Sequence, residues 1–542
     1  MKASKMAFLT ALSDIDPKYL KEFRRFLKPE PKWRIIMKKS MSFTAKAVTV
    51  AVAAVVLLGI AFLPGLFQNN ITQAAAPTEE KPLRICFDMG TKWDDSGTVQ
   101  ENYVQHLVND FCFYNAHREE GSVGYGLTED MIEIECIPGG DAMEAERVSA
   151  LKKIRTEIMA GQGPDVFICL TNGLIEDLEV EGSRLFPYVE FSMEDDLFLP
   201  LDDLIAEFEY TDPAQLTQVL MDGGKNKAGE QVLLPFRYTI PMLYFEREDL
   251  EPVDQSGKTW NDVLTSDDPL LKEQVRWAWP VWWGFEEFNR HDYHDSALPY
   301  IFPSILDTEN RGLAFTEDDL FARVQESLPV MQELMQEDSE IVNDAWYFVR
   351  PGATGGRVLN RDHSVIDRPT TLIPLRNETG GVTALIHSYG AINANTPFAK
   401  EAALFLDFLS RTANQSDPVS AGVVNVFSGM LTGTGGMPVN AEARQPNGER
   451  MGGGERYTKE TSDEWEKATQ QIDTVHFPSA MDLLIKKMTR EIGTELKESA
   501  PAVLDGPGMY PDGYANGTIS EEKLREIVHE TYKKMVELIG EA

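Results

Sequence analysis

The chain contains few residues of the kinds that carry covalent, redox or metal chemistry. Only 4 of its 542 residues are cysteine and only 8 are histidine. No CxxC, HExxH, GxSxG or P-loop motif occurs, which argues against thiol redox centres, zinc proteases, common serine hydrolases and nucleotide-binding loops. We therefore predict that the protein is not an enzyme and uses neither a cofactor nor a metal.

Positive charge is scarce beyond residue 46. Residues 1–46 carry 12 Lys and Arg against 4 Asp and Glu, although the whole chain has a net charge of −36. Residues 68–542 therefore carry a net charge of −44, which would repel phosphate groups, so nucleic acid is not expected as a partner. The apolar fraction of 42% and the charged fraction of 25% are typical of a globular protein, and the length suggests several domains.

Charge is absent from one apolar stretch of 21 residues, 47–67. As a helix this stretch would be roughly 30 Å long, which matches the apolar core of a bilayer. Basic residues precede it and acidic residues follow it, so the positive-inside rule places 1–46 in the cytoplasm and 68–542 outside the cell. We predict a single-pass cell-membrane protein with a cytoplasmic basic stub (1–46), a transmembrane helix (47–67) and a linker (68–82).

A cleaved signal peptide is the alternative for the same stretch. Ala74, Ala75 and Ala76 have the small side chains of a cleavage site. However, Pro77 follows them directly, and the basic segment before the apolar run is too long for an ordinary signal peptide. We favour the uncleaved anchor, and cleavage stays open.

Hydrophobic periodicity after residue 82 predicts an α/β domain. Apolar runs typical of buried strands alternate with helical patterns. The strands are expected at 83–89, 132–137 and 166–170, and the helices at 98–114 and 144–161. Gly161 is suited to the C-cap of the second helix. This alternation favours a parallel sheet that helices cover on both faces.

The later elements follow a less regular order. Residues 231–246 predict two strands, which form either a hairpin or a crossing between domains. A strand is expected at 384–393 and a helix at 396–410. Thr518 and Glu521 have the spacing of a capping box, which predicts the start of the last helix.

Four of the nine tryptophans lie within seven residues: Trp277, Trp279, Trp282 and Trp283. Aromatic faces pack well on the apolar faces of sugar rings, so the cluster is a candidate carbohydrate site. A cluster in the hydrophobic core is an equal alternative, because tryptophan buries a large apolar area.

Two weaker patterns favour structural roles. His291 and His294 form an HxxH motif without a further metal ligand nearby in the sequence, so we interpret them as loop histidines. Cys86, Cys136 and Cys169 fall in the three predicted strands, where cysteine behaves as a small apolar residue. A disulfide stays open, because an extracellular location permits one.

Several segments resemble bacterial extracellular solute-binding proteins of family 1, the sugar-type binding proteins of ABC transporters. They are the helix–GxGPDV–strand segment at 153–170, the L-x-PLD segment at 197–208, the crossing strand at 233–248, the TWNDVL start of a helix at 259–264, the GAIN segment at 387–410 and GMPVN at 436–440. These landmarks occur in the order found in the family.

The resemblance implies a two-lobed periplasmic-binding-protein-like (type II) fold, with a hinge and a ligand between the lobes. The N-terminal lobe is expected to comprise 83–236 and 376–412, and the C-terminal lobe 237–375 and 413–542. Carried over by motif or placed in the second lobe, the expected ligand-binding residues are Thr171, Asn172, Arg237, Tyr238, Trp279, Trp282, Trp283, Trp346 and Tyr389.

The function implied by the resemblance is capture of a carbohydrate, an oligosaccharide in our interpretation, for an ABC permease. The family is usually lipid-anchored or free in the periplasm, whereas this chain has a predicted membrane helix of its own. Two alternatives therefore stay open: a ligand-sensing receptor that signals through a partner, and an extracellular enzyme that acts on glycans.

Overall fold

The computed structural model describes residues 76–88, 98–138, 144–170, 184–245, 253–275, 301–302, 304–336, 347–349, 371–415, 437–444, 459–500 and 516–541. The stretch 47–67 lies outside these residues, as do His291 and His294. Six of the expected ligand residues also lie outside them: Thr171, Asn172, Trp279, Trp282, Trp283 and Trp346. No helix within the described ranges has both the length and the apolar character needed to cross a bilayer.

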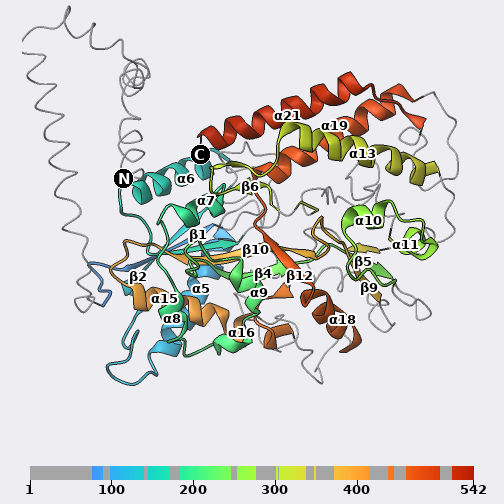
Figure 1. Ribbon diagram of the computed structural model, residues 1–542. Coiled ribbons are helices and arrows are strands. Elements are labelled where there is room, and N and C mark those ends of the chain that lie inside the picture. Colours follow the sequence, from blue (N-terminus) through green and yellow to red (C-terminus); the bar gives the residue numbers. More distant parts are fainter. Residues whose placement is uncertain are drawn as a thin grey trace, which may run out of the picture. The chain divides into compact units, whose positions relative to one another are not determined.

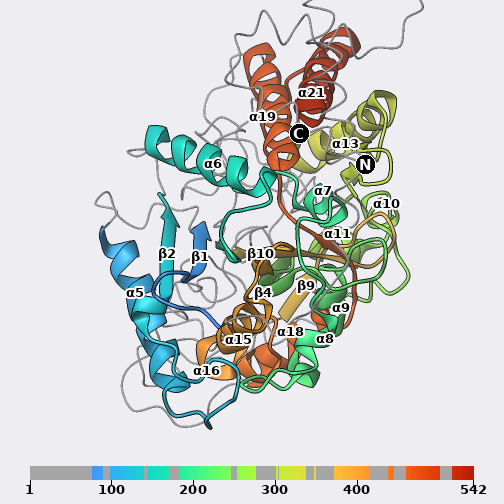
Figure 2. The ribbon, with the colours of Figure 1, turned by 90° about the vertical axis from the view of Figure 1, so that its left-hand side faces the viewer.

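Within the described residues, seven strands form one large sheet (Figures 1 and 2). They are β1 (Leu83–Asp88), β2 (Ile132–Ile137), β3 (Val166–Leu170), β4 (Leu234–Thr239), β10 (Val382–Ile392), β11 (Met437–Pro438) and β12 (Ile472–His476). In the sheet, β2, β1 and β3 are parallel neighbours, and β10 runs antiparallel between β3 and β4. β11 pairs with β4, and β12 pairs in parallel with β10.

Helices cover both faces of this sheet. α6 (Glu144–Met159) lies on one face, whereas α5 (Thr98–Asn115) and α15 (Ala399–Ser410) lie on the other (Figures 1 and 2). α6 ends as predicted: Gly161 has a φ of 73°, and the amide of Gln162 donates to the carbonyl of Glu157 at 2.9 Å. The predicted alternation of strands and helices over 83–170 is therefore confirmed.

The buried side chains of the sheet and its helices form the first core, which includes Phe87, Phe111, Phe236 and Phe405. Shorter helices frame it: α7 (Val189–Glu194), α8 (Asp202–Ile205), α9 (Gln218–Asp222), α16 (Thr412–Gln415) and α18 (Lys459–Thr469). Single 3-10 turns occur at Glu129–Met131, Pro213–Gln215 and Glu442–Arg444.

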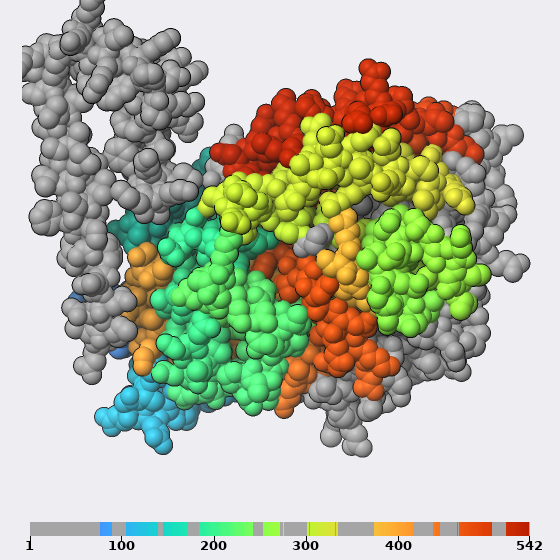
Figure 3. Space-filling model, in the orientation of Figure 1, coloured from blue at the N-terminus to red at the C-terminus, as the bar shows by residue number. Residues whose placement is uncertain are grey.

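A second core is mainly helical and includes Leu264, Leu320, Ile485 and Val528. Its helices are α10 (Trp260–Leu264), α11 (Pro269–Gln274), α13 (Glu317–Gln336), α19 (Ala480–Ser499) and α21 (Glu521–Glu541). Figure 3 shows the atoms of α13, in yellow, beside the red atoms of the C-terminal helices, and α13 and α19 both contact α21. The smaller sheets are β8 (Tyr347–Val349), β5 (Met242–Phe245) and β9 (Thr371–Pro374), and the pair β6 (Leu306–Asp307) and β7 (Gly312–Leu313).

The start of α21 differs from the prediction. The hydroxyl of Ser520 accepts from the amide of Lys523 at 3.1 Å, so Ser520 caps the helix. The amide of Thr518 donates instead to the hydroxyl of Ser499 at 2.8 Å. The predicted capping box of Thr518 and Glu521 is therefore wrong, because a nearby serine is better placed and Thr518 is held by α19.

The described chain passes between the two cores at three places. It leaves the first core after Ile240, returns between Leu375 and Val382, and leaves again between Phe477 and Ala480. Residues 83–170 and 384–410 contribute to the same sheet and core. Side chains between 437 and 477, including Met437 and Trp465, also pack in the first core, although the resemblance assigns that range to the C-terminal lobe.

Candidate functional site

The carboxyl ends of β1, β2 and β3 lie at one edge of the sheet. Asp88, the last residue of β1, is opposite Ile137 on β2 and Cys169 on β3. In open α/β sheets, ligands bind outside the carboxyl ends of the strands. The segments that follow these strands, 89–97, 139–143 and 171–183, lie outside the described residues. The candidate site is therefore described by the strand ends and the chain packed against them, which we call its floor.

Asp88 is the central anion of this floor. Its carboxylate forms an ion pair with Arg147 of α6 at 2.8 Å, and both side chains are almost completely buried. The second carboxylate oxygen accepts from the amide of Leu185 at 2.8 Å. Arg147 also donates to the carbonyl of Pro138, just after β2, at 2.9 Å. One buried pair thus ties together the ends of β1 and β2, helix α6 and the segment at 184–185.

Arg184 extends this network toward the second core. Arg155 of α6 holds the segment by donating to the carbonyls of Arg184 and, at 3.0 Å, of Leu185. The Arg184 guanidinium donates in turn to the carbonyl of Pro478, in the turn that leads to α19. Burial lowers the pKa of Arg184. Tyr389, Asp482 and Asp88 act in the opposite direction but do not outweigh burial.

A second ionisable cluster lies on that turn and was not anticipated from the sequence. The His476 ring, at the end of β12, bonds through Nε2 to Oδ1 of Asp482 at 2.6 Å. The other oxygen of Asp482 accepts from the amide and the hydroxyl of Ser479, at 2.6 and 3.0 Å. The spacing of Ser479 and Asp482 is that of a capping box, and this was the one local signal in the sequence that could have located the cluster.

The charges of this cluster depend on one another. Burial acts to lower the pKa of His476, but the Asp482 carboxylate outweighs burial and leaves the pKa raised above 6.5. Burial acts to raise the pKa of Asp482, but His476 and Ser479 leave it lowered below 3.8. Burial also raises the pKa of Glu190 on α7 to about 7, and no donor among the described residues hydrogen-bonds its Oε2 atom.

Tyr389, an expected ligand residue, lies between the end of β3 and the turn that leads to α19. It lies on β10 opposite Cys169, and its ring centroid is 5.7 Å from that of Phe477. The side chain is 6% exposed and belongs to the first core, and burial raises the pKa of its hydroxyl. The described residues thus bury the Tyr389 side chain at the strand ends, where it forms part of the floor.

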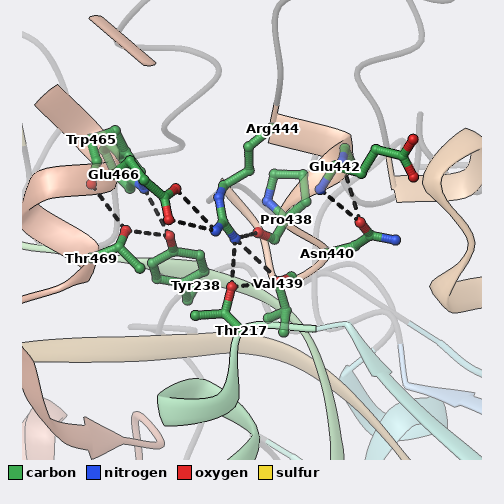
Figure 4. A network of polar contacts seen from close by, with 11 residues as sticks. Thr217, Tyr238, Pro438, Val439, Asn440, Glu442, Arg444, Trp465, Glu466 and Thr469 are labelled. Atoms are coloured by element: carbon green, nitrogen blue, oxygen red, sulfur yellow. Dashed lines mark hydrogen bonds and ion pairs between the residues drawn. The ribbon is translucent and has the colours of Figure 1, made fainter. Parts of the chain in front are cut away.

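Arg237 and Tyr238, also expected ligand residues, lie on β4, where all six side chains are buried. The guanidinium of Arg237 donates from Nη2 to the carbonyl of Gln415 at 2.7 Å. The hydroxyl of Tyr238 bonds to Oγ1 of Thr469 at 2.7 Å and accepts from the indole N–H of Trp465 at 3.0 Å (Figure 4). Both side chains therefore connect β4 to neighbouring helices.

Arg444 completes the Tyr238 network that Figure 4 shows. Its guanidinium lies 5.8 Å from the centre of the Tyr238 ring and pairs with Glu466 at 3.1 Å. It also donates to the hydroxyl of Thr217 at 2.9 Å and to the carbonyl of Pro438 at 2.7 Å. The network joins β4, β11, α9 and α18, and it stabilises the first core next to the first chain crossing.

Replacing Tyr238 with phenylalanine is expected to lower the free energy of unfolding by about 1–3 kcal/mol, because the indole N–H of Trp465 loses its buried acceptor. Urea unfolding followed by circular dichroism measures the change. Tyr125→Phe is the matched control, since this ring is 48% exposed, and it should stay within about 0.5 kcal/mol of the parent. An unchanged unfolding midpoint for Tyr238→Phe would contradict a structural role for its hydroxyl.

The four cysteines form no disulfide, and Cys86, Cys112 and Cys169 are buried. Burial raises the pKa of each of these three thiols, that of Cys112 to about 12, so they stay protonated and unreactive. No group of three metal-ligating side chains occurs among the residues that the structure describes.

Comparison with known proteins gives matches only at the level of structure. No family model matches the chain, and no curated protein matches it. Similar solved structures include an extracellular solute-binding protein of family 1 from Alicyclobacillus acidocaldarius, with 13% identity, a TM-score of 0.41, and coverage of 86% of this chain and 100% of the other. A periplasmic oligogalacturonide-binding protein from Yersinia enterocolitica has 11% identity, a TM-score of 0.42, and coverage of 85% and 99%.

A third similar structure is a de novo designed esterase, with 11% identity, a TM-score of 0.39, and coverage of 84% and 98%. The proteins found thus include the family that the sequence segments resemble.

Proposed function

We propose that this protein is a membrane-tethered extracellular solute-binding protein, which captures a carbohydrate between two lobes for an ABC importer. In this proposal the first and second cores are the two lobes of a type II periplasmic-binding-protein-like fold, and the three chain crossings form the hinge. Residues 47–67 anchor the chain, with the N-terminus in the cytoplasm. The charge asymmetry around this stretch supports that orientation.

One observation carries the proposal: the carboxyl ends of three parallel strands meet next to a place where the chain crosses between two cores. The amide of Leu185 bonds to Asp88 at the end of β1. The neighbouring Arg184 side chain bonds to the carbonyl of Pro478 in the third crossing. A ligand held at these strand ends would therefore contact chain from both cores, and cleft closure sequesters a polar ligand from water. The tryptophan cluster at 277–283 supports a sugar as that ligand.

A thermal-shift screen of the full-length chain with mono- and oligosaccharides tests the proposal. Binding to the native state raises stability by about 2.7 kcal/mol when the ligand is at 100 times its Kd. At least one pyranose sugar should raise the unfolding temperature, whereas the linear polyol glucitol should not, because it has no ring face. Recovery of the bound sugar unchanged would distinguish capture from hydrolysis.

Failure of every carbohydrate in the screen, over concentrations up to the millimolar range, would contradict the proposal. A sugar that stabilises the protein but is cleaved would favour the enzyme alternative. With a binding sugar in hand, Trp279→Ala, Trp282→Ala and Trp283→Ala show whether the cluster contacts it, because loss of one ring contact worth about 1.4 kcal/mol weakens affinity tenfold.

A further inference from the structure

The third crossing between the cores contains buried ionisable groups. Phe477 packs in the first core and Met481 in the second, so the turn between them spans the boundary. His476 and Asp482 stand at the two ends of this turn and bond to each other at 2.6 Å. Their pair closes the turn, with the imidazole on β12 and the carboxylate on α19.

Side chains in and just before helix α7 also pack in both cores. Val189 and Met193 pack in the first core, whereas Tyr188, just before the helix, and Phe191 pack in the second. Glu190 lies on this helix and acts electrostatically on both His476 and Asp482. The chain just before α7 contacts the same turn directly, because the Arg184 guanidinium donates to the carbonyl of Pro478.

The charged groups that act on His476 come from three segments: Asp482 on α19, Glu190 on α7 and Arg184 before α7. Arg184 is coupled in turn to Asp88, Tyr389 and Cys169 at the strand ends, and it acts on His387 of β10. Of these groups, His476 has a pKa raised above 6.5, and Glu190 has a pKa raised to about 7.

We propose that His476, Asp482 and Glu190 form a pH-sensitive latch, which holds α7 against the start of α19 while His476 and Glu190 are protonated and loosens when those protons leave. Loss of the His476 proton leaves Asp482 as a buried carboxylate without its cation. Loss of the Glu190 proton adds a second buried negative charge beside Asp482. Both events weaken the bridge between the cores, whatever ligand the protein binds.

The direction of the pH dependence follows from the two pKa values. Because the pKa of His476 is raised above 6.5, its contribution is complete below about pH 6.5 and is lost as pH rises through the folded value. Because the pKa of Glu190 is raised from 4.5 to about 7, its ionisation opposes the fold increasingly between those values. Asp482, with a lowered pKa, keeps its contribution until the pH falls below about 3.8.

Hydrogen–deuterium exchange of the full-length chain at pH 5.5 and 8.0 tests the latch. After correction for the intrinsic exchange rate, the amides of 189–194 and 480–484 should exchange at least about tenfold faster at pH 8.0. The pKa of Glu190 is raised from 4.5 to about 7, and each pKa unit corresponds to a factor of ten. Amides of α15, which lies on the face of the sheet opposite α6, should show no such change.

Two variants separate the latch from a general effect of pH. His476→Gln should exchange quickly at both pH values, and Glu190→Gln should stay protected further into the alkaline range than the parent. His529→Gln is the matched control, because His529 pairs with Glu317 at 3.1 Å on the surface, and it should leave the profile unchanged.

The latch is wrong if the parent shows no pH-dependent change in these amides, or if both variants keep the parent's profile. If His476→Gln does not fold, Glu190→Gln decides alone: a shifted profile supports the latch, and an unshifted one overturns it.

Discussion

Replacing Asp88 with asparagine is expected to lower the free energy of unfolding by about 3–5 kcal/mol, because it leaves the buried Arg147 guanidinium without a compensating charge. The pair is 2.8 Å long, and its side chains are 0% and 1% exposed. Asparagine keeps nearly the same shape and can still accept from the amide of Leu185, so the loss reports the charge. Urea unfolding followed by circular dichroism measures it.

Two variants serve as controls for this result. In the double variant Asp88→Asn/Arg147→Met both charges are gone, so much of the lost stability should return, since an apolar side chain can replace a buried ion pair at little cost. Asp195→Asn breaks the exposed pair with Arg311, which has a similar length of 2.7 Å, and should cost no more than about 1 kcal/mol. Equal losses for the buried and the exposed pair would show that the Asp88 site is open to water.

Phe405→Ala is expected to destabilise the protein by about 3–5 kcal/mol, because it removes a fully buried ring from the first core. Phe405 lies on α15, and its ring centroid is 5.0 Å from that of Phe111 on α5 and 6.4 Å from that of Phe87 on β1. Both contacts are edge-to-face. One truncation therefore loosens two helices and the sheet together, and the urea midpoint should fall accordingly.

Phe113→Ala is the matched control for this truncation. Phe113 is on α5, two residues from Phe111, but its side chain is 64% exposed. Its loss should change the free energy of unfolding by no more than about 0.5 kcal/mol. A small effect of Phe405→Ala, comparable to that of Phe113→Ala, would contradict the packing of α15 against α5 and the sheet.

Local patterns in the sequence were sufficient to predict much of the first core. The helix expected at 98–114 is α5, whose apolar residues recur at helical spacing, and the strand expected at 384–393 is β10. For the two strands at 231–246, local patterns could not decide between a hairpin and a crossing. The two strands, β4 and β5, join different sheets, so the segment is a crossing, but the choice depends on partners far along the chain.

The candidate site was harder to predict because its interactions are non-local. Asp88 pairs with Arg147, and Arg184 reaches Pro478, whereas a sequence pattern reports mainly neighbours within a few positions. In a chain with 87 acidic residues, the few that are buried do not stand out. Every position of β4, which carries Arg237 and Tyr238, is buried, so period-2 alternation does not mark a ligand-facing side of this strand.

The position of β10 in the sheet has a consequence for biosynthesis. β10 separates β3 from β4, yet it is made roughly 140 residues after β4. At a synthesis rate of about 5–20 residues per second, β4 waits roughly 7–30 s and β3 roughly 10–40 s for their shared partner. During that time each has an unpaired edge, which is a template for intermolecular pairing. The nascent chain is therefore most exposed to aggregation before residue 392 is made, and a slower ribosome lengthens that period.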